Sequence, residues 1–171
     1  MIRIVIAEDQ EMLLGAMGSL LNLEEDMEVV GQASNGEEAL VLVHRLKPDI
    51  CIMDIEMPEM SGLEAAKALS SFHSKVIILT TFARSGYYQR ALQADVSGYL
   101  LKDSPSEELA NSIRSIVNGD RIYCQELIDE DSINHEQEIE VLQPRLEQQT
   151  KIATVRNYLT TILDKMKMPT G

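Results

Sequence analysis

Residues 2–9 of the chain read IRIVIAED, a run of apolar and mostly β-branched residues that ends in two acidic side chains. The run does not alternate polar with apolar residues, so it predicts a strand covered on both faces. Residues 75–80, KVIILT, have the same character. Strands of this kind are typical of a parallel sheet that lies between two layers of helices.

Outward from these runs, strand-like and helix-like stretches alternate five times between residues 1 and 118. The predicted strands are Ile2–Ala7, Glu28–Ala33, Asp49–Met53, Val76–Thr80 and Gly98–Leu101, and the predicted helices are Glu11–Leu23, Gly36–Leu46, Gly62–Ser71, Ser85–Gln93 and Pro105–Asn118. This order predicts a doubly wound α/β fold with a five-stranded parallel sheet and right-handed crossovers. Asn118 and Gly119 are typical of a helix end, so we expect the domain to span residues 1–118.

The composition fits one globular domain with a short remainder, since the 171 residues are 44% hydrophobic and 25% charged. No apolar run approaches the roughly 18 residues of a membrane span. The first strand follows Met1 directly, so we expect a cytoplasmic protein without membrane insertion.

Cys51 and Cys124 predict neither a disulfide framework nor a zinc site. The net charge of −13 argues against sequence-independent attraction to nucleic acid.

Polar side chains stand at the carboxyl ends of four predicted strands, where ligands bind in a doubly wound sheet. Glu8 and Asp9 follow the first strand, Asp54 the third and Lys102 the fifth, and Thr80 ends the fourth. Each is ordinary at a strand end when taken alone, because Asp commonly caps helices and forms turns. Their ordered occurrence on four strands favours one shared site. Three neighbouring carboxylates repel one another unless a cation neutralises them, and oxygen ligands suit Mg²⁺.

The same chemistry predicts a role for each group in phosphoryl transfer, where a protein mainly positions groups and neutralises charge. We predict that Asp9 and Asp54 bind Mg²⁺ directly, that Glu8 acts through a coordinated water, and that the backbone carbonyl of Glu56 is a further ligand. Lys102 and the Thr80 hydroxyl are predicted to hold phosphoryl oxygens. Asp54 is the predicted nucleophile and becomes an aspartyl phosphate. An aspartate-nucleophile phosphatase is rejected because position 56 is Glu, and that chemistry needs a second Asp there as its acid.

Residues 1–118 resemble the receiver domains of bacterial two-component response regulators. The resemblance rests on Glu8-Asp9, on MDIEMPEMSG at residues 53–62, and on Thr80, Tyr99 and Lys102. It implies a CheY-like (flavodoxin-like) fold, Mg²⁺ as cofactor, a sensor histidine kinase as partner, and a protein that is not a turnover enzyme. It also implies a switch in which Thr80 moves toward the phosphoryl group and Tyr99 rotates into the space vacated.

The segment LLKD, residues 100–103, resembles the NarL/LuxR-type subfamily of these regulators. Two positions depart from the common receiver pattern. Glu8 stands where many receivers have Asp, which implies a small shift of the Mg²⁺ geometry. Asp103 follows Lys102 where many receivers have Pro.

The first helix, residues 10–23, is apolar over more than half of its circumference, which exceeds what one buried stripe requires. Its apolar residues are Met12, Leu13, Leu14, Ala16, Met17, Leu20, Leu21 and Leu23. Gly15 and Gly18 would also allow close approach by another element. We therefore expect part of this helix to contact a second copy of the chain in a phosphorylation-promoted homodimer, or to contact the kinase. The alternative is a first helix that the sheet and its neighbours cover deeply.

The C-terminal part is predicted as a linker over residues 119–133 and a mostly helical remnant over residues 134–171. Residues 135–142 resemble the opening helix of a LuxR-type helix-turn-helix domain, and residues 154–166 resemble its recognition helix. The candidate DNA-binding residues are Arg156, Asn157, Thr160, Thr161 and Lys165. The spacing between the two segments is about ten residues too short for that domain, and the chain stops before the family's final helix. One long helix between Pro144 and Pro169 is the alternative structure.

Two functions therefore remain open at this point. The first is a phosphorylation-dependent response regulator that descends from a DNA-binding transcriptional regulator. The second is a receiver-only signalling or dimerisation module that no longer binds promoter DNA. The residues after Asn118 include 6 basic and 10 acidic side chains, a balance that favours the second.

Overall fold

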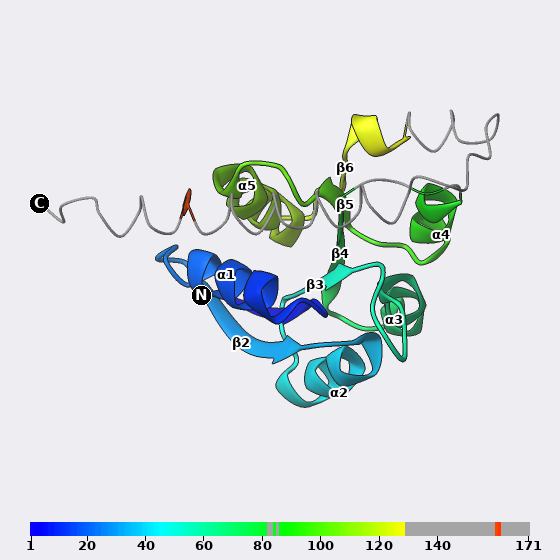
Figure 1. Ribbon diagram of the computed structural model, residues 1–171, viewed down its shortest axis with the longest axis horizontal. Coiled ribbons are helices and arrows are strands. Elements are labelled where there is room, and N and C mark those ends of the chain that lie inside the picture. The colour runs from blue at the N-terminus through cyan, green and yellow to red at the C-terminus, as the bar shows by residue number, and fades with distance from the viewer. Residues whose placement is uncertain (82–83, 85, 129–159, 162–171) are drawn as a thin grey trace, which may run out of the picture.

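A parallel β-sheet forms the centre of the computed structural model, which describes residues 1–81, 84, 86–128 and 160–161 (Figure 1). Its strands are β1 (Ile2–Ala7), β2 (Met27–Ala33), β3 (Ile50–Asp54), β4 (Lys75–Thr80), β5 (Gly98–Leu101) and β6 (Ile122–Tyr123). The order across the sheet is β2-β1-β3-β4-β5-β6, and every neighbouring pair is parallel. The predicted doubly wound α/β fold is confirmed.

Five helices cover the two faces of this sheet within the described residues. They are α1 (Glu11–Leu21), α2 (Gly36–Leu46), α3 (Gly62–Leu69), α4 (Tyr87–Gln93) and α5 (Ser106–Val117). Figure 1 shows α1 and α5 on one side and α2, α3 and α4 on the other. The side chains of β1 alternate between these two layers of helices. Ile4 and Ile6 pack with α1 and α5, whereas Val5 and Ala7 pack with α2 and α3, because successive side chains of a strand point to opposite faces.

Short polar residues fix where two of the helices begin. The Asn35 side chain accepts a hydrogen bond from Glu38 N, over 2.8 Å, at the start of α2. At the start of α3, Ser61 and Glu64 form a capping box, in which each side chain accepts a hydrogen bond from the other residue's backbone N–H. These bonds satisfy backbone donors that have no partner inside a helix. The second cap also fixes the loop that leads away from Asp54.

The number of strands corrects the sequence prediction, which expected five. The sixth strand, Ile122–Tyr123, lies inside the stretch 119–133 that was expected to be a linker. Its backbone is held by Ile122 N, which donates to Ser97 O over 3.0 Å, and by Cys124 N, which donates to Tyr99 O over 2.8 Å. Two residues are too few to show a strand pattern in the sequence, but they are enough to cover the edge of β5.

Helix α1 is largely covered by the sheet and its neighbours. Leu13, Ala16, Met17, Leu20 and Leu21 are buried, and α1 ends at Leu21 rather than at the predicted Leu23. The exposed apolar surface of this segment is therefore small. Met12 is 64% exposed and Leu23 is 45% exposed.

The two glycines of α1 differ in their surroundings. A side chain at Gly18 would collide with the Gln32 amide of β2, so Gly18 allows the close approach that the sequence suggested. The space around Gly15 is open. The close approach at Gly18 is thus made by β2 of the same chain, and the expected contact with a partner stays a prediction.

The predicted DNA-binding residues fall mostly outside the described part of the chain. Thr160 and Thr161 are helical, while Arg156, Asn157 and Lys165 lie outside the described residues, as does most of the predicted remnant 134–171. In the part that the structure describes, we find no helix that is both long and apolar enough to cross a membrane.

Candidate functional site

The carboxyl ends of β1, β3, β4 and β5 meet at one edge of the sheet, and the predicted polar residues meet there with them. Asp54 is the last residue of β3 and Thr80 the last of β4, while Glu8 and Lys102 directly follow β1 and β5. Carboxylate oxygens of Glu8, Asp9 and Asp54 all lie within 4.8 Å of one another. The three carboxylates and the one ammonium therefore lie together at this edge, as the sequence predicts.

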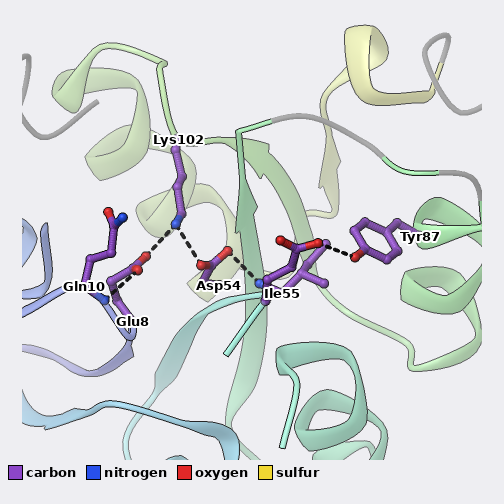
Figure 2. A network of polar contacts seen from close by, with 7 residues as sticks. Glu8, Gln10, Asp54, Ile55, Tyr87 and Lys102 are labelled. Carbon is purple, nitrogen blue, oxygen red and sulfur yellow. Dashed lines mark hydrogen bonds and ion pairs between the residues drawn. The ribbon is translucent and has the colours of Figure 1, made fainter. Parts of the chain in front are cut away.

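Lys102 joins the two buried carboxylates of this cluster (Figure 2). Its Nζ lies 2.5 Å from Glu8 Oε2 and 3.0 Å from Asp54 Oδ2. The side chains of Lys102 and Glu8 are each 1% exposed, and that of Asp54 is 7% exposed. Charges this deeply buried are stable only when they are paired, so the three groups form one electrostatic unit.

The pKa values of the cluster follow from its burial and its charges. Burial and the neighbouring Asp54 raise the pKa of Glu8 to about 7, although Lys102 opposes this shift. Burial lowers the pKa of Lys102, but Asp54 and Glu8 raise it by more, so its pKa lies above the ordinary value. Lys102 therefore carries a positive charge at neutral pH. A shifted acid and a buried cation in one polar cluster are typical of a functional site.

The loop after β3 fixes Asp54 from its backbone side. Ile55 N donates a hydrogen bond to Asp54 Oδ1 over 2.8 Å, and Gly62 N donates to Ile55 O over 2.9 Å. A Cβ atom at Gly62 would lie only 2.0 Å from the backbone oxygen of Asp54. Only glycine fits this position, so the glycine that ends the MDIEMPEMSG segment lets the loop fold back against Asp54.

The donor set of the cluster suits a hard divalent cation. Glu8, Asp9 and Asp54 supply only oxygen atoms, which Mg²⁺ prefers, and Asp9 is exposed to solvent. Glu8 is more constrained, because its Oε2 contacts Lys102 and its Oε1 accepts a hydrogen bond from Gln10 N over 3.1 Å. The residues present therefore fit Mg²⁺, with Asp9 as the most accessible ligand.

The predicted switch residues lie on neighbouring strands beside this cluster. Thr80 is buried, and its backbone oxygen accepts a hydrogen bond from Lys102 N over 2.8 Å. Tyr99 has no exposed surface, and its ring centroid lies 6.2 Å from that of Tyr88 on α4. Tyr88 also contacts Tyr123 of β6, again with 6.2 Å between ring centroids. The tyrosine of β5 thus lies in an aromatic cluster that includes the unpredicted sixth strand.

Tyr87 and Arg84 are contacts of the site that the sequence did not reveal. Tyr87 Oη donates a hydrogen bond to Glu56 Oε1 over 2.9 Å, and Arg84 Nε lies 3.1 Å from the same oxygen. Burial and the hydrogen bond to Glu56 raise the pKa of Tyr87 to about 12. Both residues are far from Glu56 in the sequence, and no local pattern links them to it.

Comparison with known proteins agrees with this geometry. The family model described as the response regulator receiver domain matches residues 4–114, a span that begins within β1, includes β2 to β5 and contains the acidic cluster. The chain belongs to the response regulator receiver family. It is a phosphorylation-dependent two-component response regulator.

Two relatives share more than half of their aligned residues with this receiver protein. It is 55% identical to the transcriptional regulatory protein DesR of Bacillus subtilis over 182 residues, which cover 98% of this chain and 92% of the relative. It is 52% identical to the uncharacterized transcriptional regulatory protein YvfU of the same organism, with 97% and 91% covered. The 182 aligned positions outnumber the 171 residues of this chain, so the relatives carry residues within the aligned span that it lacks.

Solved structures show the same receiver fold. A LuxR-family DNA-binding response regulator from Staphylococcus aureus is 41% identical, with a TM-score of 0.66 over 69% of this chain and 100% of that chain. A LuxR-family two-component response regulator from Aurantimonas is 26% identical, with a TM-score of 0.70 over 79% of this chain and 98% of that chain. The predicted resemblance to NarL/LuxR-type regulators is confirmed.

Proposed function

We propose that Asp54 is the residue that receives the phosphoryl group in this response regulator. The observation that carries the proposal is the position of Asp54 at a strand end, 3.0 Å from the buried Lys102 ammonium and beside the carboxylates of Glu8 and Asp9. A nucleophilic carboxylate needs an oxygen directed to the reacting phosphorus and cations that neutralise the phosphoryl charge. The cluster supplies the nucleophile and one of the cations.

The reaction that we propose is a transfer from a phosphohistidine of a sensor histidine kinase. A carboxylate oxygen of Asp54 forms a bond to phosphorus while the bond between phosphorus and the histidine nitrogen breaks. The imidazole nitrogen leaves with the electron pair and takes up a proton. Lys102 turns from the Asp54 carboxylate to a phosphoryl oxygen, and the Thr80 hydroxyl donates a hydrogen bond to another.

Mg²⁺ is the proposed cofactor, held by Asp9, Asp54 and the backbone carbonyl of Glu56, with Glu8 acting through a water molecule. When bound, the ion neutralises negative charge on the phosphoryl oxygens. The support for it is the all-oxygen donor set of the cluster. The residues of the chain orient the nucleophile, since the Ile55 N–H fixes one oxygen of Asp54.

The proposed response to phosphorylation is a movement of Thr80 toward the phosphoryl group and a rearrangement of Tyr99. Both side chains are buried, so a change in the position of either one requires its neighbours to repack. The two packings form a two-state equilibrium that the new hydrogen bonds bias. The regulator is also proposed to be cytoplasmic and to form a phosphorylation-promoted homodimer, with the exposed part of helix 10–23 as a contact.

The experiment is phosphorylation with acetyl phosphate and Mg²⁺, followed by intact-mass measurement. We expect wild-type protein to gain the mass of one phosphoryl group, and we expect Asp54→Asn protein and wild-type protein in excess chelator to gain none. Asp9→Asn should require more Mg²⁺ for the same rate. Phosphorylation of the Asp54→Asn protein at wild-type rate would overturn the proposal.

The output of the regulator has two candidates, because the names of its relatives include transcriptional regulation while its own residues after Asn118 are net acidic. In the first, promoter DNA is contacted through Arg156, Asn157, Thr160, Thr161 and Lys165. In the second, the protein is a receiver-only signalling module. A mobility-shift titration of the phosphorylated protein separates them. Sequence-selective, salt-sensitive binding would support the first, and no binding above that of random DNA would support the second.

A further inference from the structure

The Glu56 carboxylate is held from the side of the site that faces α4. Tyr87, the first residue of α4, donates to Glu56 Oε1, and Arg84 forms an ion pair with the same oxygen. In Figure 2, Lys102 and Glu8 lie on one side of Asp54 and Tyr87 lies on the other. The two contacts therefore tie the loop after β3 to the start of α4, across the site from the lysine.

Glu56 follows Asp54 by two residues, so its charge is close to the reacting group. Its side chain is 36% exposed, and it would be able to change rotamer in solvent if it had no partner. A carboxylate that turned toward Asp54 would add a negative charge beside an incoming phosphoryl donor, and like charges a few ångströms apart repel. Holding Glu56 at α4 keeps this charge away from the donor.

We propose that Tyr87 and Arg84 are positioning residues for the phosphorylation of Asp54, an inference that rests on the proposed function above. Tyr87 fixes the direction of the Glu56 carboxylate, and the Arg84 guanidinium balances its charge. Neither residue touches the phosphoryl group. Both act through Glu56, and the consequence is a faster reaction with anionic phosphoryl donors.

Replacing Glu56 by Gln removes the charge at this position and therefore separates two possible roles of Tyr87, control of the Glu56 carboxylate and stabilisation of α4. If Tyr87 only stabilised α4, removal of its hydroxyl would have the same effect whether residue 56 were Glu or Gln. If Tyr87 controls the Glu56 carboxylate, its removal matters only while residue 56 carries a charge. The two roles therefore differ in a double-mutant cycle.

The experiment measures the rate of phosphorylation by acetyl phosphate in saturating Mg²⁺ for the full chain. In this reaction an Asp54 oxygen bonds to phosphorus, the bond from phosphorus to the acetate oxygen breaks, and acetate leaves with the electron pair. We expect Tyr87→Phe to slow phosphorylation at least about threefold, as a nearby unscreened charge does. We expect Glu56→Gln and the double variant Tyr87→Phe/Glu56→Gln to react at equal rates. Gln89→Ala, at an exposed position of α4, is the control, and its rate should equal that of wild type.

Arg84→Gln is a second variant that we expect to slow phosphorylation. It tests the proposal if Tyr87→Phe does not fold. Circular dichroism identifies folded variants. A wild-type rate in both folded variants, or equal slowing by Tyr87→Phe with Glu and with Gln at position 56, would overturn the inference. A wild-type protein that takes no phosphoryl group at Asp54 would instead overturn the proposed function itself, so the two failures are distinct.

Discussion

Lys102 Nζ lies 2.5 Å from Glu8 Oε2, and both side chains are 1% exposed. The same nitrogen lies 3.0 Å from Asp54 Oδ2, so one buried ammonium forms ion pairs with two carboxylates. This arrangement stabilises the acidic cluster without a metal ion. It also places a permanent positive charge next to the oxygen atoms that a divalent cation would use, so lysine and metal compete for the same negative charge.

The first prediction concerns this competition. Lys102→Gln removes the ammonium but keeps a polar side chain of similar length. We expect the variant to bind Mg²⁺ at least about threefold more tightly, because the repulsion between the two cations is lost. The measurement is a calorimetric Mg²⁺ titration without phosphoryl donor. The same variant should be phosphorylated more slowly by acetyl phosphate, since Lys102 no longer contacts a phosphoryl oxygen.

Lys75→Gln is the control for this change. Lys75 is the first residue of β4 and therefore lies at the opposite edge of the sheet from Lys102. Its removal changes the net charge equally but leaves the cluster intact, so the Mg²⁺ affinity should stay within error of wild type. Equal affinities of the Lys102→Gln and wild-type proteins would contradict the competition.

The second prediction concerns Gly62. A Cβ atom there would lie 2.0 Å from the backbone oxygen of Asp54, which no rotamer change can relieve. We expect Gly62→Ala to lower the free energy of unfolding by about 3 kcal/mol or more, because the loop after β3 must move. Urea denaturation followed by circular dichroism measures the change. Phosphorylation of Asp54 should also slow, since the displaced loop carries Ile55.

Gly15→Ala is the matched control, because an added Cβ at this position of α1 would have no other element of the fold within 4 Å. Alanine in an exposed helix interior is more stable than glycine by roughly 0.5–1 kcal/mol. The free energy of unfolding should therefore rise. Similar losses of stability in both variants would show that the contact with Asp54 is not the cause.

Much of this molecule follows from local sequence patterns. The sheet from β1 to β5 and its helices are predictable because apolar runs and helical periods are long and regular between residues 1 and 118. The meeting of Asp9, Asp54 and Lys102 is predictable too, because parallel strands bring their carboxyl ends to one edge.

The sixth strand and several side-chain contacts cannot be predicted in this way, because they form between residues that are far apart in the sequence. Strand β6 has two residues and exists because the edge of β5 offers backbone partners, a condition set by the fold and not by Ile122 and Tyr123 themselves. The contact of Tyr87 with Glu56 spans 31 positions and requires α4 to be placed first. The strand order predicts that Glu8 and Lys102 meet at one edge, but their direct contact depends on side-chain conformations that only the folded cluster sets.

The third prediction concerns the thiol of Cys51, the second residue of β3. Burial raises its pKa from the ordinary 9.0 to about 12, so the folded state binds the thiol proton more tightly than the unfolded state. The stability that comes from this proton is therefore present below about pH 9 and is lost as the pH rises toward 12. In a Cys124→Ser protein, a thiol reagent at about pH 8 should react only after unfolding. Rapid reaction of the native variant would contradict the burial of Cys51.

The last prediction concerns Tyr123 and the sixth strand. Tyr123 Oη donates to Val96 O over 2.6 Å, and its ring packs on Tyr88, so its side chain holds β6 to the sheet. We expect Tyr123→Phe to lose about 1 kcal/mol of stability from the hydrogen bond, and Tyr123→Ala to lose about 2 kcal/mol or more because the ring contact is lost as well.

Hydrogen exchange at the Cys124 amide, which donates to Tyr99 O, should accelerate most in the alanine variant. Glu126→Gln is the control, since Glu126 is exposed just after β6 and a surface substitution there should change stability by no more than about 0.5 kcal/mol. If the Cys124 amide exchanged as slowly in Tyr123→Ala as in wild type, β6 would be held by its backbone alone and the aromatic contact would have no part in it.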